Sequence, residues 1–180
     1  MEIPGKWKEI LSKVQTISPD AIIAGGALRD LDNGKPIKDL DIFVPLTADF
    51  SLGSFYNIFG VREIDESSNA EEYQNNEEVW GVYVYNLPDF DIPVNIIVCT
   101  PNENFVNHQL ERFDIGICKI AYNGKEVIRH HWYNIDKEAK SLCIYNTLWL
   151  DSSLKRLNRL GEKYQGWGQL NLVLNACQTN

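Results

Sequence analysis

The sequence lacks any stretch that could serve as a membrane-spanning helix or a secretory signal. No run approaches the roughly 20 consecutive apolar residues that a membrane helix needs. Near the N-terminus, Lys6, Lys8 and Glu9 interrupt every apolar run, so we expect no signal peptide. We therefore expect a cytoplasmic protein with no membrane partner.

Cysteine pairs of the kind that hold zinc are also missing. The four cysteines, Cys99, Cys118, Cys143 and Cys177, lie far apart and form no Cys-x-x-Cys pair. Three of them fall in apolar runs. This placement is typical of buried free thiols in a reducing compartment, and it argues against disulfides and zinc sites.

Positive charge is scarce, because 17 Lys and Arg residues face 25 Asp and Glu residues and leave a net charge of −8. Such a chain is poorly suited to wrap a long nucleic acid, which requires a basic face, although a local basic patch remains compatible with it. The length of 180 residues and the hydrophobic share of 44% are sufficient for one compact domain with a proper core.

Hydrophobic periodicity predicts an α+β fold, with a mixed sheet of about five strands backed by helices on one face. We expect helices over residues 5–17, 47–59, 102–111 and 151–163, and a short helix after 166–168. We expect strands over residues 21–24, 39–44, 79–86, 92–99, 115–122 and 127–129. The polar, acidic residues 65–78 are typical of an exposed loop.

The segment IIAGGALRDLDNGKPIKDLDIFV, residues 22–44, carries two acids on one predicted strand. Because successive strand residues point to opposite faces, Asp39 and Asp41 point the same way. Two adjacent carboxylates repel each other unless a cation lies between them. Hard oxygen ligands suit magnesium, and two such ions about 4 Å apart can stabilise the attacking and leaving oxygens of a phosphoryl transfer.

A glycine turn precedes the acidic strand and strengthens this interpretation. Gly25 and Gly26 allow the backbone to approach a ligand closely, and the helix that follows offers free N–H groups to phosphate oxygens. Arg29 lies in the first turn of that helix, from where it could reach the same anion. The acid pair alone is more typical of a solvated strand edge, whereas the glycines, Arg-Asp and the acid pair together favour a functional site.

These residues resemble the signature of the DNA polymerase beta-like nucleotidyltransferase superfamily: a hydrophobic residue, two small residues, a spacer of about a dozen residues, then acid–hydrophobic–acid. The spacer between Gly26 and Asp39 is twelve residues. Within the superfamily, GGALRD looks most like the head domain of tRNA CCA-adding enzymes and bacterial poly(A) polymerases. WGVYVY (80–85) resembles the family's FGTVTV strand, and RFDIGICKIAY (112–122) is similar to its RRDFTINALAY.

The resemblance implies a nucleoside triphosphate, such as ATP, bound with two magnesium ions on the acid pair. A hydroxyl attacks the α-phosphate and pyrophosphate leaves. The residues carried over are Asp39 and Asp41 as catalytic metal ligands, Gly25, Gly26 and Arg29 for the triphosphate, and Arg112 and Asp114 for the sugar or base.

One position departs from the family pattern. The third carboxylate should lie on the strand Val94 to Val98, where this chain has Asn95. An amide can ligate a metal through its carbonyl oxygen but brings no charge, so the second magnesium ion is in question. Asp91 could substitute only if the strand bends at Pro93.

The C-terminal part weakly resembles the family's first neck helix, EDPLR, over residues 151–167. We expect a head domain at residues 1–146 and a helical extension at 147–180 packed on it. Lys155, Arg159 and Lys163 share one helix face by their spacing. Lys155 or Arg159 could therefore reach the incoming nucleotide, and a solvated helix face is an equal alternative.

The function predicted is magnesium-dependent transfer of a nucleoside monophosphate onto a hydroxyl of an RNA 3′ end, a protein or a small molecule. The alternative is a degenerate nucleotide-binding protein that acts as a sensor, a decoy or an interaction partner. Compact members of the superfamily also occur in phages, and we expect a compact, phage-type member as one form of this resemblance. The acceptor, the preferred base and the oligomeric state stay open.

Overall fold

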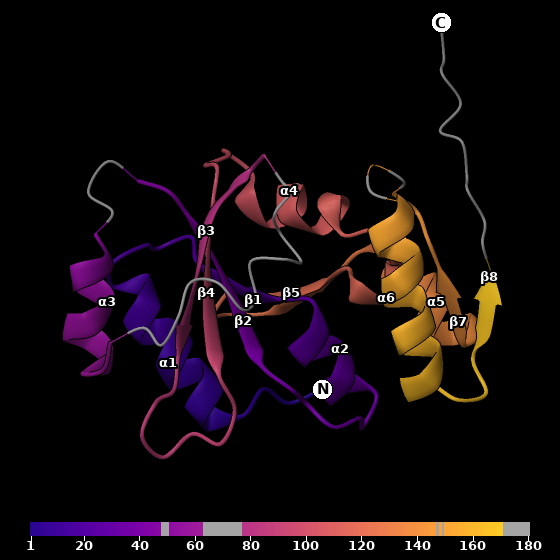
Figure 1. Ribbon diagram of the computed structural model, residues 1–180, viewed down its shortest axis with the longest axis horizontal. Helices are drawn as coiled ribbons and strands as arrows, with labels where there is room; N and C mark the ends of the chain where they lie inside the picture. The colour runs from indigo at the N-terminus through magenta and orange to yellow at the C-terminus, as the bar shows by residue number, and fades with distance from the viewer. Residues whose placement is uncertain (48–50, 63–76, 147, 149, 171–180) are drawn as a thin grey trace, which may run out of the picture.

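The structure is a computed structural model and describes residues 1–47, 51–62, 77–146, 148 and 150–170. Figure 1 shows how the helices and strands are arranged. The helices are α1 (Gly5–Gln15), α2 (Gly26–Asp32), α3 (Leu52–Phe59), α4 (Phe105–Arg112), the 3₁₀ turn η2 (Gly116–Cys118), α5 (His131–Ala139) and α6 (Leu150–Lys163). The strands are β1 (Ile22–Ala24), β2 (Leu40–Pro45), β3 (Val79–Tyr85), β4 (Val94–Cys99), β5 (Ile120–Tyr122), β6 (Val127–Arg129), β7 (Ser141–Cys143) and β8 (Gly168–Leu170).

Six strands form one mixed sheet in the order β3-β4-β2-β1-β5-β6. The neighbours β2 and β4 are parallel, whereas β3–β4, β1–β2, β1–β5 and β5–β6 are antiparallel. A separate parallel pair joins β7 to β8. The α+β fold with a mixed sheet is therefore confirmed, and each of the six predicted strand segments contributes a strand to the sheet.

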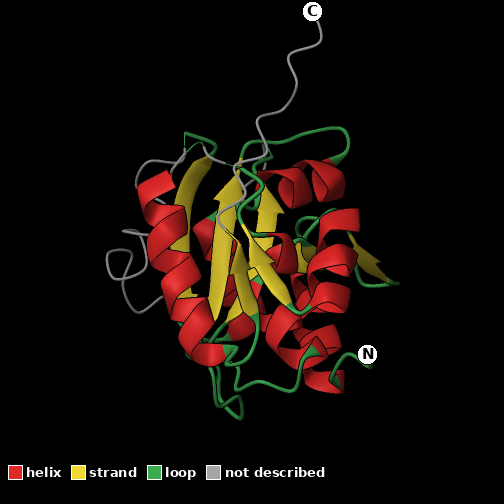
Figure 2. Ribbon diagram, turned by 90° about the vertical axis from the view of Figure 1, so that its right-hand side faces the viewer, coloured by secondary structure: helices red, strands yellow, loops and turns green. Residues whose placement is uncertain are grey.

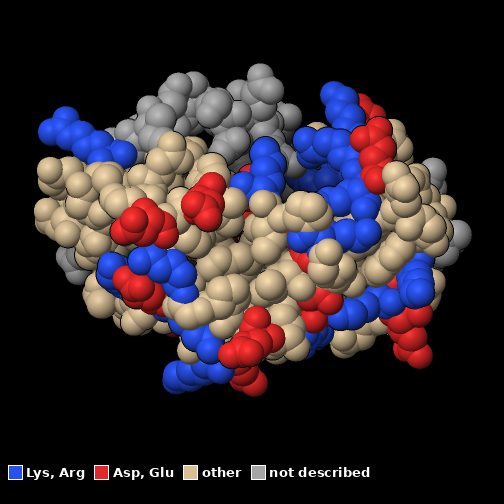
Figure 3. All heavy atoms as spheres, turned by 90° about the horizontal axis from the view of Figure 1, so that it is seen from below, with Lys and Arg blue, Asp and Glu red and all other residues tan. Residues whose placement is uncertain are grey.

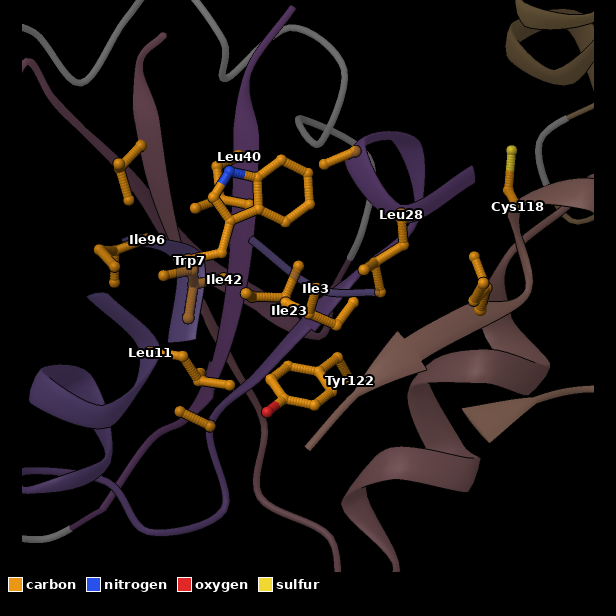
Figure 4. Packing of buried hydrophobic residues seen from close by; sticks show 14 of the residues in the cluster. Ile3, Trp7, Leu11, Ile23, Leu28, Leu40, Ile42, Ile96, Cys118 and Tyr122 are labelled. Atoms are coloured by element: carbon orange, nitrogen blue, oxygen red, sulfur yellow. The ribbon is translucent and has the colours of Figure 1, made fainter. Parts of the chain in front are cut away.

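One face of the sheet packs against α1, whose apolar residues follow helical spacing. Trp7 and Leu11 of α1 belong to the same buried cluster as Ile23, Ile42 and Ile96 of the central strands (Figure 4). Burying each such side chain stabilises the fold by about 1.5–3 kcal/mol. This cluster is the main core. The side of β2 that carries Ile42 packs into it and therefore faces away from the acid pair.

The opposite face of the sheet is covered by α4. Phe105 and Leu110 of this helix pack with Phe43 and Ile97, which point away from the main core. Figure 2 shows helices on both sides of the strands. The expectation of helices on one face only was therefore wrong, because the amphipathic helix α4 returns across the second face.

Two local predictions also fail in the second half of the chain. The strand predicted over 115–122 is interrupted by η2 before β5 begins. Residues 168–170 form β8, which pairs with β7, and the rest of the predicted terminal helix lies outside the described residues. Most of the predicted acidic loop at 65–78 lies outside them as well.

The prediction that the cysteines are buried free thiols is confirmed for those that the structure describes. Cys99, Cys118 and Cys143 are free and buried, and Cys177 lies outside the described residues.

Helix α6 packs onto the main core, since its Leu157 belongs to the main cluster. The boundary between residues 146 and 147 stays a prediction. In the described parts of the chain, every helix is too short or too polar to cross a membrane.

Candidate nucleotide and metal site

The glycine turn lies beside the start of β2. The antiparallel register pairs Ile23 with Ile42, and its extension by one residue puts Ala24 opposite Asp41. The turn therefore begins next to the acid pair, as the sequence predicted. Gly25 has φ +79°, a conformation that L side chains rarely adopt, and the Phe113 ring lies over it.

Replacing Gly25 by alanine is expected to lower the free energy of unfolding by about 1–3 kcal/mol. An added Cβ would lie 3.2 Å from two ring carbons of Phe113 on a backbone of positive φ. The control is Gly5→Ala, since a Cβ at Gly5 meets nothing within 4 Å. Urea unfolding of both variants measures the effect, and equal stability would contradict the strain at Gly25.

Asp41 and Asn95 lie directly opposite each other on the parallel strands β2 and β4. Asn95 Nδ2 donates a hydrogen bond of 2.8 Å to Asp41 Oδ1, and Asn95 is 4% exposed. Both residues alternate with main-core residues, so they share the sheet face on which Phe43 and Ile97 lie. The structure thus places Asn95 against the acid pair, while its role as a metal ligand stays a prediction.

Asp39 comes one residue before β2 and is partly exposed. Its Oδ2 lies 3.7 Å from Lys38 Nζ, and the Lys38 side chain is 83% exposed. A surface pair of this kind contributes little stability and leaves the carboxylate accessible to another cation.

The donor set suits a single hard cation. Among the described residues, no group of three or more His, Cys, Asp and Glu side chains could hold a metal ion. Asp39 and Asp41 supply two carboxylates two residues apart, and Asn95 supplies an amide. Because the amide nitrogen faces Asp41, Asn95 can ligate through its oxygen only after its side chain flips.

Arg29 is held beneath the glycine turn instead of lying in the open. Its Nε and Nη2 donate to Asp30 at 2.8 and 3.0 Å, and its Nη1 donates to Cys118 Sγ at 3.1 Å. Its Nη2 also lies 3.6 Å from the Cβ position of Gly26. The charge of Arg29 is therefore near the turn and largely balanced by Asp30, and direct contact with a triphosphate stays a prediction.

Replacing Asp30 by asparagine is expected to lower the free energy of unfolding by about 2 kcal/mol at pH 7, because Arg29 then lacks its buried partner. Burial alone would raise the pKa of Asp30, but Arg29 and Lys163 outweigh it and hold the pKa below its usual value. This stability is present above the unfolded pKa and is lost as pH falls through the folded pKa.

The difference in the free energy of unfolding between wild type and Asp30→Asn should therefore become smaller below about pH 4. Chemical denaturation across pH measures it, with the exposed Asp20→Asn as the control. A gap that stays constant down to the acid limit would contradict the assignment.

Arg112 lies at the far end of β4 from Asn95. Its Nη1 lies 2.6 Å from Glu78 Oε1, and the other carboxylate oxygen of Glu78 lies 2.6 Å from His108 Nε2. The charge of Arg112 also acts on the thiol of Cys99, whose pKa burial raises to about 12. Cys99 is four residues beyond Asn95, or about 13 Å along the strand. The structure therefore does not bring Arg112 to the acid pair.

Asp114 contacts α6 through Arg156, a residue that the sequence analysis did not identify. Its Oδ2 lies 2.6 Å from Arg156 Nη1, and its carbonyl accepts the N–H of Tyr145 at 2.7 Å. The neighbours Lys155 and Arg159 are exposed on the outer side of the helix. Their contact with a nucleotide stays a prediction.

The rotation of α6 about its own axis explains why the sequence analysis did not identify Arg156. The buried positions Ser153, Leu157 and Leu160 turn Arg156 toward Asp114. Lys163, seven residues further, contacts Asp30, so it does not share the outward side of Lys155. The spacing of these buried residues is the signal in the sequence that could have identified Arg156.

Comparison with known proteins gives similarity in fold only. No protein-family model matches the chain, and no curated protein matches it. The Thermotoga maritima CCA-adding enzyme complexed with tRNA matches 94% of this chain with TM-score 0.68 and 15% identity. A tRNA-processing enzyme in an apo form matches 95% with TM-score 0.67 and 17% identity. The Bacillus stearothermophilus CCA-adding enzyme with CTP matches 93% with TM-score 0.59 and 16% identity.

This chain spans less than half the length of these structures, covering 40%, 45% and 42% of them respectively. It has the fold of the covered part of the CCA-adding enzymes, so the predicted resemblance in fold is confirmed. Their substrates are not thereby assigned to this chain.

Proposed function

We propose that the chain is a magnesium-dependent nucleotidyltransferase that moves a nucleoside monophosphate from a triphosphate onto a hydroxyl acceptor. The observation that carries this proposal is the pairing of Asp41 with Asn95 on parallel strands beside the glycine turn. The similar solved structures include enzymes with ATP, with CTP and with tRNA, which supports nucleotide and RNA partners in general.

In this proposal Asp39 and Asp41 hold the magnesium ion, which when bound acts as a Lewis acid on the phosphate oxygens. Gly25 and Gly26 admit the phosphates close to the backbone, with the charge of Arg29 beneath them. Asp114, fixed by Arg156, would contact the sugar or base where the sheet meets α6. Arg112 would do so only after leaving Glu78.

The charge of the donor set limits the number of ions. Two carboxylates neutralise one divalent cation, and the amide of Asn95 adds no charge. We propose one firmly held magnesium ion, with a second ion dependent on a flip of the Asn95 amide. The protein would act in the cytoplasm, with residues 1–146 as the head and 147–180 as an extension packed on it.

The test is incubation of the purified chain with each labelled nucleoside triphosphate, magnesium and candidate acceptors: RNA oligonucleotides, protein extract and small polyols. The expected result is label transfer that requires magnesium and stops on chelation. Absence of transfer from all four triphosphates to every acceptor would overturn the enzymatic proposal.

A second candidate is a protein that binds nucleotide with little turnover. The observation that favours it is the amide of Asn95, which occupies the place opposite Asp41 where a carboxylate would strengthen the metal site. Calorimetry with a non-hydrolysable triphosphate and magnesium tests this candidate. Binding without transfer would support it, and absence of both would leave only an interaction role.

A further inference from the structure

Asp30 of α2 is bound by two cations that come from distant parts of the chain. Arg29 Nε and Nη2 donate to its two carboxylate oxygens, and Lys163 Nζ donates to Oδ2. Tyr164, which follows Lys163, donates its hydroxyl to Oδ1 at 2.9 Å. The C-terminal end of α6 therefore reaches the pair that lies beneath the glycine turn.

These bonded groups carry a surplus of one positive charge. Arg29 and Lys163 contribute two positive charges, and Asp30 contributes one negative charge. Burial raises the pKa of the Tyr164 hydroxyl and that of the Cys118 thiol, which accepts a hydrogen bond from Arg29, so both groups stay neutral. Without Lys163, the group beneath the turn would have no net charge.

The guanidinium of Arg29 keeps hydrogen-bonding capacity on the side of the turn. Within the described residues it donates two hydrogen bonds to Asp30 and one to Cys118, whereas a guanidinium carries five N–H groups. Nη2 has two hydrogens and gives one of them to Asp30, so its second N–H is unused there. Nη2 lies 3.6 Å from the Cβ position of Gly26, which is partly exposed. A phosphate oxygen at the turn can therefore accept from Arg29 without breaking its contact with Asp30.

Lys163 is close enough to the turn for its charge to act there. Asp30 Oδ2 and Arg29 Nη2 join its Nζ to the Cβ position of Gly26, which limits their separation to about 9 Å. Two unit charges at this distance change affinity by on the order of tenfold near a protein surface. The Lys163 side chain is 27% exposed, so salt screens part of this effect.

A local positive surplus matters because the chain as a whole repels polyanions. Its net charge is −8, and the acid pair of Asp39 and Asp41 lies beside the turn. Figure 3 shows Lys and Arg side chains gathering around a hollow in the right half of the molecule, the half that holds α6 in Figure 1. This half, to which α6 contributes Lys163, is therefore the side that attracts a polyanion.

We propose that Lys163 is the charge-balancing residue of the glycine turn: it neutralises Asp30, so that the charge of Arg29 remains available to the polyphosphate of a nucleotide. The inference rests on the proposed function, because it gives α6 a part in holding the same triphosphate. Lys163 acts through Asp30 and Arg29, so it is a positioning residue and not a catalytic one.

The alternative is a purely structural role, in which the ion pair between Lys163 and Asp30 only holds α6 against α2. Loss of Lys163 would then lower the stability of the fold, and removing Asp30 as well would restore nothing. Charge balance predicts the opposite, because a second substitution that removes the negative charge returns the surplus to one. The two roles therefore differ in the sign of a measurable effect.

The test is calorimetric titration of the purified chain with inorganic tripolyphosphate and magnesium, a probe that has neither sugar nor base. Lys163→Gln removes the surplus charge and should raise the dissociation constant on the order of tenfold. Lys163→Arg keeps the charge and should bind as wild type does. The control Lys8→Gln, the same change at an exposed lysine of α1, should leave binding unchanged.

Asp30→Asn should change tripolyphosphate binding in the opposite direction. It leaves two cations beneath the turn, so the dissociation constant should fall on the order of tenfold even though the fold is less stable. The double variant Asp30→Asn, Lys163→Gln leaves one cation, as in wild type, and should bind about as tightly as wild type. If Lys163 only held α6 in place, the double variant would bind no better than Lys163→Gln.

Salt gives an independent measure of the same charge. The difference in affinity between wild type and Lys163→Gln should become smaller as salt approaches 1 M, where the Debye length is about 3 Å. Circular dichroism verifies that each variant is folded, and Lys163→Gln against Lys163→Arg decides the proposal if the asparagine variants unfold. The proposal is overturned if Lys163→Gln binds like Lys8→Gln, if the folded double variant stays as weak as Lys163→Gln, or if wild type does not bind tripolyphosphate.

These outcomes separate the role of Lys163 from the enzymatic proposal. The variants leave Asp39 and Asp41 intact, and binding is measured without a nucleotide. Tripolyphosphate binding that depends on Lys163, in a chain that transfers nothing, would sustain this inference and overturn the enzyme. Nucleotidyl transfer by a chain whose Lys163→Gln variant binds tripolyphosphate as wild type does would sustain the enzyme and overturn this inference.

Discussion

Nucleotidyl transfer should fall at least a thousandfold when Asp41 is replaced by asparagine, while the chain stays folded. The replacement removes one of the two carboxylates that hold magnesium, and metal stabilisation of transferring phosphate oxygens contributes several kcal/mol. Asparagine keeps the side-chain volume, and its oxygen can still accept the hydrogen bond from Asn95 Nδ2. The loss should therefore be chemical and not structural.

The measurement is the initial rate of labelled-nucleotide transfer at saturating magnesium, with circular dichroism and thermal melting of the same samples. Asp20→Asn, an exposed aspartate before β1, is the matched control and should transfer at the wild-type rate. Without metal, Asp41→Asn should melt at or slightly above wild type, since it relieves repulsion with Asp39. Unchanged transfer would remove Asp41 from the site.

Local patterns were sufficient to predict the elements that build the acid pair. Alternation along residues 39–44 predicted β2, and the two glycines predicted the turn before α2. Both depend on residues adjacent in sequence, where side-chain period and backbone conformation are set locally. The match of Arg112 and Asp114 to one family block placed β5 downstream, although the helical turn η2 inside that block was not foreseen.

Long-range partners could not be read from the sequence. Helix α5 was missed because one of its buried positions is Asp136, an acid where periodicity expects an apolar residue. Asp136 is buried because it accepts the backbone N–H groups of Ile117 and Cys143, at 3.1 and 3.2 Å. Such partners belong to the backbone of other segments and leave no trace in a hydrophobic pattern.

The same reason explains the partial prediction of the site. Whether Arg29 faces a ligand or a neighbouring carboxylate depends on the packing of α2 against Cys118, which is 89 residues away. Whether Lys155 or Arg156 faces the sheet depends on which residues of α6 are buried. Sequence spacing identifies the candidates, and tertiary contacts choose among them.

Restoring a carboxylate with Asn95→Asp should lower the dissociation constant for magnesium by on the order of a hundredfold. The new carboxylate would lie beside Asp41 and would attract the magnesium ion. Opposite charges about 4 Å apart attract each other by about 4 kcal/mol at a protein surface, and desolvation offsets part of this energy. Any transfer activity should rise with metal occupancy. Without metal the variant should be less stable, since three carboxylates would converge and the amide hydrogen bond would be lost.

Parallel magnesium titrations of wild type and Asn95→Asp, followed by calorimetry, thermal melting and transfer, test this prediction. The matched control is Asn95→Leu, which removes the hydrogen bond to Asp41 without adding charge. It should lose stability as the aspartate variant does, but it should gain no affinity for magnesium. If the aspartate variant also gains none, Asn95 does not occupy a ligand position, and Asp91 and Asp114 are the next candidates for the third ligand.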